Sequence, residues 1–265
     1  MKNIDKADIF SPLFILNGNQ LSVLPGTIYA GHAMPEEVAL PKKLKPGTDY
    51  AIAVEDGKAL GASIDYTPDA SFIGGFHVGL DGQIVERSIW DCKFRPKALD
   101  PRGMILIGDF WADIYLLNVD PRKNGTSAAC REIATGTHKI ALRGGLEPLT
   151  WWSAVAALAG DGKQLLSMAE FSVATMGVTE GKTAGEKPET TCHIKGLKSS
   201  YGLEQATGCM WTWGRDFDPS GGWPVVMGGD WYSVAAGPRR FSYDHPVYGG
   251  SDVGARGRCD HLILA

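Results

Sequence analysis

The chain has 265 residues, of which 44% are hydrophobic and 21% are charged, with a formal net charge of -4. This length can bury a substantial core in one large domain or two small ones. The acidic balance argues against a nucleic-acid-binding surface, and no apolar run reaches the roughly 20 residues of a membrane helix. The first residues have no apolar signal-peptide core, so we do not expect Sec secretion.

Short strands are predicted throughout the first part of the chain. An Asp-Gly turn at 56–57 joins apolar residues 52–54 to residues 59–64, and a second at 81–82 joins residues 76–80 to 83–85. Asp-Gly between alternating apolar residues is a strong hairpin signal. No helical periodicity interrupts this region. We predict a small all-β domain over residues 1–90, either a sandwich or a meander.

A linker and two apolar strands follow. Residues 94–103 hold two prolines and a glycine, which places a domain boundary within about residues 88–100. Residues 104–107 and 110–117 are apolar and are predicted to form a strand pair that opens the second domain, over residues 91–265.

A first helix is predicted after Thr150, which can cap it, and before Gly160, which can end it. Apolar residues recur at the i, i+3, i+4, i+7 spacing of one helix face. These residues are Trp152, Val155, Ala156 and Ala159.

A second helix is predicted to begin at Ser167. Glu170 lies three residues later, which is the spacing of a capping box. Phe171 and Ala174 continue the helix, and Gly177 ends it.

The C-terminal part is rich in glycine and tryptophan. Residues 207–216 alternate apolar side chains at Cys209, Trp211 and Trp213, which predicts a strand. An irregular segment is expected over residues 232–252, and residues 253–264 are predicted to close the fold, with the last strand near 258–264.

The five cysteines are widely spaced and contain no Cys-x-x-Cys pair, which makes a zinc site improbable. Reduced thiols buried as small apolar side chains are the default interpretation for all five, most firmly for Cys209 and Cys259. The histidines do not have the His-Glu-x-x-His spacing of a zinc protease. We therefore predict no metal, no cofactor and no enzymatic activity.

Three C-terminal motifs together resemble a known family. They are Gly208-Cys-Met-Trp-Thr-Trp213, Gly228-Gly-Asp-Trp231 and the final Gly254-Ala-Arg-Gly-Arg-Cys-Asp-His-Leu-Ile-Leu264. They resemble the end of a C-type-lectin-fold domain of the formylglycine-generating-enzyme-like branch. More narrowly, they are similar to phage major tropism determinants and other variable proteins of diversity-generating retroelements. The resemblance covers about residues 88–265 and implies an α+β protein, with a C-terminal C-type lectin fold preceded by the small all-β domain.

The same resemblance implies a tail-fibre-type, virion-associated protein that is made in a bacterial cytoplasm and binds a host-cell surface receptor, protein or glycan. It also implies a homotrimer attached to other tail proteins through the N-terminal domain. The implied ligand-binding residues are Asp230, Tyr232, Phe241, Tyr243, Asp244, His245, Tyr248 and Asp252. The implied structural residues are Trp211, Trp213, Trp231, Arg240 and Arg256, the two arginines holding backbone carbonyls.

Two other functions stay open at this point. One is a bacterial or prophage-encoded variable ligand-binding protein, and the other is an oxidoreductase of the formylglycine-generating type. No asparagine follows Asn124, which argues against active diversification, because diversified segments of this family are commonly rich in asparagine.

Overall fold

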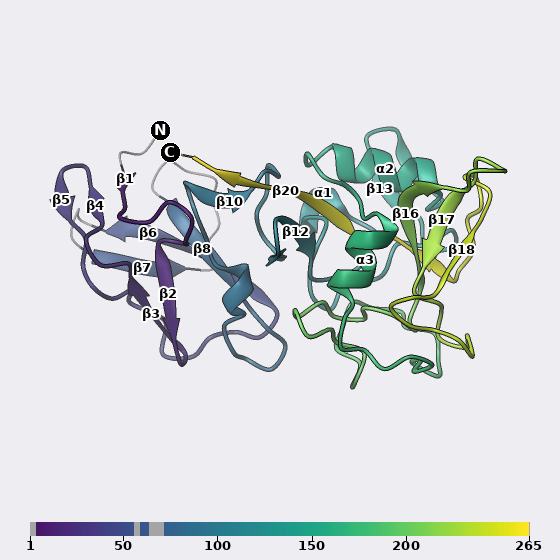
Figure 1. Ribbon diagram of the computed structural model, residues 1–265, viewed down its shortest axis with the longest axis horizontal. Coiled ribbons are helices and arrows are strands. Elements are labelled where there is room, and N and C mark those ends of the chain that lie inside the picture. Colours follow the sequence, from purple (N-terminus) through teal and green to yellow (C-terminus); the bar gives the residue numbers. More distant parts are fainter. Residues whose placement is uncertain (1–3, 56–58, 64–71, 265) are drawn as a thin grey trace. The chain divides into compact units, whose positions relative to one another are not determined.

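The computed structural model describes residues 4–55, 59–63 and 72–264 (Figure 1). The chain divides into two compact units: residues 1–97 together with 260–265, and residues 98–259. The predicted division at residue 90 assigned the whole C-terminal strand to the second domain, whereas the last six residues belong to the first unit.

The first unit contains a four-stranded antiparallel sheet. Its order is β7 (Ala59–Ser63), β6 (Thr48–Glu55), β8 (Phe72–Val78) and β9 (Trp90–Asp91). Strands β6 and β7 pair from Ala51 with Ser63 to Glu55 with Ala59, as a hairpin requires. The Asp-Gly turn predicted between them lies outside the described residues.

The second predicted hairpin of this unit is present, but its return side is too short to form a strand. The bridge of Val78 with Ile84 and two backbone hydrogen bonds, from Gly79 to Gln83 and from Val85 to His77, join its two sides, and η1 (Glu86–Ser88) follows. The Ser88 hydroxyl donates to the Val85 carbonyl, and the backbone N–H of His77 donates to Ser88 Oγ. The Ser88 hydroxyl therefore bonds to the His77 N–H and the Val85 carbonyl, two backbone groups that would bond to each other in a longer hairpin.

Shorter strand pairs complete the described part of this unit. β2 (Phe14–Asn17) pairs with β3 (Gln20–Val23). A further small sheet has the order β1 (Ile4–Asp5), β4 (Ile28–Tyr29) and β5 (His32–Ala33). β10 (Phe94–Pro96) pairs with the end of β20 (Gly257–Ile263), from Phe94 with Ile263 to Pro96 with His261. Buried apolar side chains such as Phe14, Ile52 and Phe76 form the core.

The second unit holds two sheets. In one, β20 lies beside β12 (Phe110–Asp113), β12 pairs with β11 (Met104–Ile107), and β15 (Gln164–Leu165) also pairs with β20. The other has the order β18 (Phe241–Tyr243), β17 (Pro224–Met227), β16 (Trp211–Phe217) and β19 (Val253–Gly254). Separate from these are the hairpin of β13 (Ile140–Leu142) with β14 (Gly145–Glu147) and the short helix α1 (Pro121–Asn124). The strand pair after the linker and the last strand are confirmed.

The helix predicted after Thr150 is confirmed as α2 (Trp151–Ala159), but its predicted buried face is wrong. The Thr150 side chain accepts a hydrogen bond from the backbone of Ser153, which completes a capping box. The helix buries Ser153, Ala154 and Leu158, while Trp152 is 57% exposed. Since the helix carries apolar residues on all of its faces, their periodicity could not identify the face that meets the core.

The second predicted helix is confirmed in its start, its cap and its inward face. It is α3 (Met168–Ala174), with a reciprocal capping box between Ser167 and Glu170. Phe171 and Ala174 are buried as expected. The Glu170 carboxylate also receives hydrogen bonds from Arg215 and Arg258, which tie the helix to both sheets.

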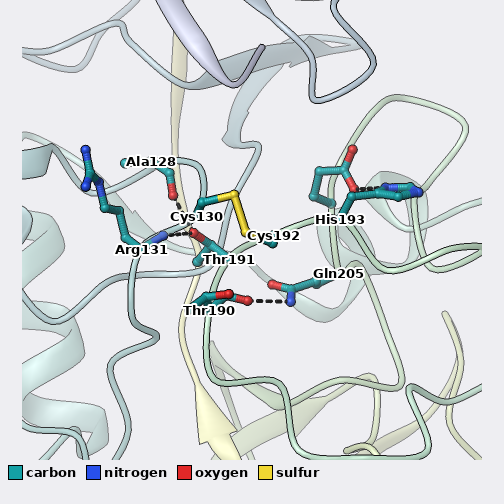
Figure 2. The surroundings of a disulfide bond; sticks show 9 residues. Ala128, Cys130, Arg131, Thr190, Thr191, Cys192, His193 and Gln205 are labelled. Atoms are coloured by element: carbon teal, nitrogen blue, oxygen red, sulfur yellow. Dashed lines mark hydrogen bonds and ion pairs between the residues drawn. A yellow bond between two sulfur atoms is a disulfide. The ribbon is translucent and has the colours of Figure 1, made fainter.

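Cys130 and Cys192 form a disulfide, which corrects the prediction that all five thiols are reduced (Figure 2). The two cysteines are 62 residues apart in the sequence, but their segments run side by side. Backbone bonds from Thr191 to Arg131 and from Ile133 to Glu189 hold these segments together. The other three cysteines are not part of this disulfide; Cys209 and Cys259 are buried as predicted, whereas Cys92 is only partly buried. A cross-link over so long a loop restricts the unfolded chain strongly.

Candidate functional site

The segment from Asp230 to Asp252, called here the C-terminal segment, is less irregular than predicted. Residues Phe241–Tyr243 form β18, an edge strand that pairs antiparallel with β17. Met227 pairs with Phe241 and Val225 with Tyr243. Figure 1 shows β18 beside β17 in the second unit. Part of the segment is thus fixed to the sheet, which gives its side chains a rigid support.

Most of the aromatic side chains predicted for the site are open to solvent. Tyr232 is 66% exposed, Phe241 49% and Tyr248 37%. His245 is also exposed, while Tyr243 is half-buried. The rings of Phe241 and Tyr243 meet edge to face, with 6.4 Å between their centroids.

Asp230 corrects the prediction, because it is buried and not exposed. Its Oδ1 accepts hydrogen bonds from the backbone N–H of Tyr232 and from the Ser233 hydroxyl. These are the bonds by which an aspartate stabilises a turn after itself. Asp230 therefore shapes the backbone that presents Tyr232, and the carboxylate has no surface on which to meet a ligand.

Tyr248 and Asp252 form a polar pair at the other end of the segment. The Tyr248 hydroxyl donates to Asp252 Oδ1 at 2.9 Å, and both side chains are partly accessible. Burial, followed by this hydrogen bond, raises the pKa of Tyr248 to about 12. The charge of Asp230 raises the pKa of Tyr232, and Asp252 adds to the same effect. Both phenols are therefore protonated at neutral pH. The Tyr248 proton is donated to Asp252, so its oxygen can accept a hydrogen bond from a partner, whereas the exposed Tyr232 hydroxyl can donate one.

Trp211 at the start of β16 contacts Arg240 of the C-terminal segment. The Arg240 guanidinium is 5.8 Å from the centroid of the Trp211 ring, a cation–π contact. The Trp211 backbone N–H donates to the Asp252 carbonyl, which joins β16 to the end of the segment. Arg240 is exposed, and the contact that holds its side chain is this ring and not the backbone carbonyls that we expected.

The other tryptophans differ in burial. Trp213 is fully buried in the core, whereas Trp231 is half-buried and meets Tyr232 edge to face at 5.3 Å. Asp244 is half-buried, and its carboxylate accepts a hydrogen bond from the backbone N–H of His245. Asp244 thus shapes the turn after β18 while keeping partial access to solvent.

Arg256 is the main internal support of the second unit. It is fully buried, and its guanidinium donates to the carbonyls of Asp113, Ile114, Glu204 and Gln205. Burial lowers the pKa of Arg256 to about 10, which leaves it charged at neutral pH. One side chain therefore joins the end of β12 to the loop before β16.

Trp223 is an exposed aromatic residue that the predicted site omitted. It is 48% exposed and meets the His245 ring edge to face at 6.0 Å. In the sequence it lies directly before the apolar run of β17, outside the segment to which the resemblance assigned binding. The Gly221-Gly222 pair before it is a turn signal, which is consistent with a tryptophan at the end of a strand.

The described residues contain no group of three or more His, Cys, Asp or Glu side chains that could hold a metal ion. Burial raises the pKa of the Cys209 thiol to about 12, which keeps it protonated and unreactive at neutral pH. Within the described part of the chain, no helix is long and apolar enough to span a membrane.

Comparison with known proteins gives one curated relative and several solved structures that match over almost the whole chain; no protein-family model matches. The chain is 32% identical to the tail fiber receptor-binding protein of Bordetella phage BPP-1, covering 98% of this chain and 84% of the relative. It superposes on the U1 variant of the major tropism determinant with a TM-score of 0.89 and 31% identity, over 99% of this chain and 86% of that one. The M1 variant gives a TM-score of 0.89 and 31% identity over 100% and 87%. This likeness confirms the C-type lectin fold that the sequence motifs predict.

Proposed function

Because the chain belongs to the family of phage major tropism determinants and tail-fibre receptor-binding proteins, we propose that it binds a receptor on the surface of a host cell. The observation that carries this proposal is the cluster of aromatic side chains on the C-terminal segment, all of them exposed except the half-buried Tyr243. We call this cluster the aromatic surface; its members are Tyr232, Phe241, Tyr243, His245 and Tyr248, with Asp244 and Asp252 at its edge.

The chemistry of the aromatic surface supports binding. Tyrosine and phenylalanine offer large contact areas with few rotatable bonds, so little conformational entropy is lost when a partner covers them. The Tyr232 hydroxyl adds a directional donor to the apolar area, and the Tyr248 oxygen, whose proton is donated to Asp252, adds an acceptor. Exposed aromatic clusters of this kind are typical of partner sites and uncommon on surfaces without a function.

The rigidity of the support favours the same interpretation. The pairing of β18 with β17, the turn held by Asp230 and the Trp211–Arg240 contact each fix part of the segment. A surface that is already ordered before binding loses less conformational entropy when it binds the receptor.

The competing functions have weaker support. An oxidoreductase of the formylglycine-generating type would need reactive thiols, whereas Cys209 and Cys259 are buried. A prophage-encoded variable protein would use the same surface, and the relation to a phage tail-fibre protein favours the virion as its location.

The direct test is binding of the purified protein to intact cells. Fluorescently labelled protein should bind cells of a susceptible bacterial strain in a saturable way, and an excess of unlabelled protein should displace it. Heat-denatured protein and a resistant strain are the controls. Binding that does not saturate, or that is equal on both strains, would contradict receptor recognition.

We also propose that the protein is a homotrimer, whose first unit attaches to other tail proteins. Linked copies bind a multivalent cell surface far more strongly than single sites do. Light scattering at micromolar concentration should give three times the chain mass of 28.5 kDa. A mass equal to that of one chain would exclude the trimer and would leave the aromatic surface as a monovalent site.

A further inference from the structure

The outer face of α2 borders a groove that the aromatic surface does not include. The groove has a volume of about 800 Å³ and lies among α2, the β13–β14 hairpin and α1. Both α1 and α2 pack against β13, and Figure 1 shows the three elements together in the second unit. A cavity of this volume can hold a ligand of two or three sugar rings. None of its lining residues belongs to the C-terminal segment.

Three arginines and three carboxylates line the groove, so its positive charge is local to the arginines that have no carboxylate partner. Arg102 is paired with Asp100 through two side-chain nitrogens, and Asp161 lies 3.1 Å from Lys163, which also pairs with Asp113. Arg122 and Arg143 have no carboxylate partner among the described residues, although both line the groove. An unpaired guanidinium offers a planar pair of donors that fits a carboxylate.

Trp152 supplies an apolar surface beside these arginines. It is 57% exposed although it stands on a helix whose other face enters the core. Its ring meets Trp151 edge to face at 4.8 Å, and Trp151 Nε1 donates to the Gly214 carbonyl. Ala156 and Gly160, which leave room for a ligand because they lack bulky side chains, continue the lining. An exposed indole held in place in this way can accept the apolar face of a sugar ring.

We propose that this groove binds a saccharide that carries a carboxylate. A sugar ring packs on Trp152, the carboxylate pairs with Arg143 while Arg122 adds positive charge to the same groove, and Glu147 of β14 accepts hydrogen bonds from sugar hydroxyls. Glu147 also disfavours a ligand with several negative charges, such as a polyphosphate, since it opposes the two arginines. A protein partner is disfavoured because the arginines and the carboxylate lie around a recess and not on a flat face.

The test uses two probes that differ only in charge. Titration calorimetry of the full chain should detect binding of a galacturonic-acid trisaccharide and at least tenfold weaker binding of its neutral methyl ester. The variants Arg143→Ala and Trp152→Ala should each weaken acid binding at least tenfold, which corresponds to about 1.4 kcal/mol. Arg131→Ala removes the same charge from an exposed position outside the groove and should have no effect.

The outcomes separate this site from the aromatic surface. Replacement of Tyr232 and Tyr248 should leave saccharide binding unchanged, so loss of one activity would not imply loss of the other. Equal binding of the acid and its ester, or full binding by the Trp152 variant with an unchanged melting temperature, would overturn the proposal. Parallel titrations with purified lipopolysaccharide and with capsular polysaccharide identify which cell-surface polymer supplies the acidic sugar; binding to neither would also overturn it.

Discussion

Replacing Tyr232 and Tyr248 together by alanine is expected to abolish binding to host cells and to leave the fold intact. Tyrosines at the centre of an interface can each contribute about 2 kcal/mol or more, so the pair corresponds to a loss of roughly a thousandfold in affinity. Tyr232 is 66% exposed, and the Tyr248 hydroxyl donates to the partly exposed carboxylate of Asp252, so neither side chain supports the core. Surface replacements of this kind usually change stability by about ±0.5 kcal/mol.

Cell binding measured by flow cytometry, with melting temperature alongside, decides the result. Phe10→Ala is the matched control, because Phe10 is an aromatic residue that is 71% exposed in the first unit. Normal binding by the double variant would show that the receptor site lies elsewhere. Loss of binding by the Phe10 variant would move the site to the first unit.

Replacing Arg256 by methionine is expected to destabilise the second unit by at least about 3 kcal/mol. Methionine has a similar length but donates no hydrogen bond, so the carbonyls of Asp113, Ile114 and Glu204 lose their donor inside the core. Each buried polar group left without a partner costs about 1–3 kcal/mol. The buried position leaves no route for water to replace the guanidinium.

Urea unfolding of the variant, followed by tryptophan fluorescence, measures this loss as a lower transition midpoint. Arg240→Met is the matched control: it removes the same charge from an exposed residue whose contact is the Trp211 ring, and it should cost about 0.5–1 kcal/mol. Similar midpoints for the two variants would mean that Arg256 is not the support that its hydrogen bonds indicate.

The local elements followed from local chemistry. Ser167 and Glu170 are three residues apart, and that spacing alone allows the reciprocal bonds of a capping box, so the start of α3 was readable. The closing strand was readable from its apolar run. The exposure of Tyr232, Phe241 and Tyr248 followed from aromatic residues in a glycine-rich segment that the resemblance assigned to binding.

What the sequence determined by itself was the family, the capped helices, the strand order along the chain and the segment that carries the aromatic surface. Those features depend on residues near one another in the sequence. The tertiary structure decided which face of α2 meets the core, that Cys130 reaches Cys192, and that Asp230 turns inward. Each of these features depends on which distant segment packs beside the residue. A helix that is apolar on all sides can bury any of its faces, and a cysteine can pair with any other cysteine that the fold brings close, here one 62 residues away. A carboxylate at a turn can point inward or outward, and only packing decides which.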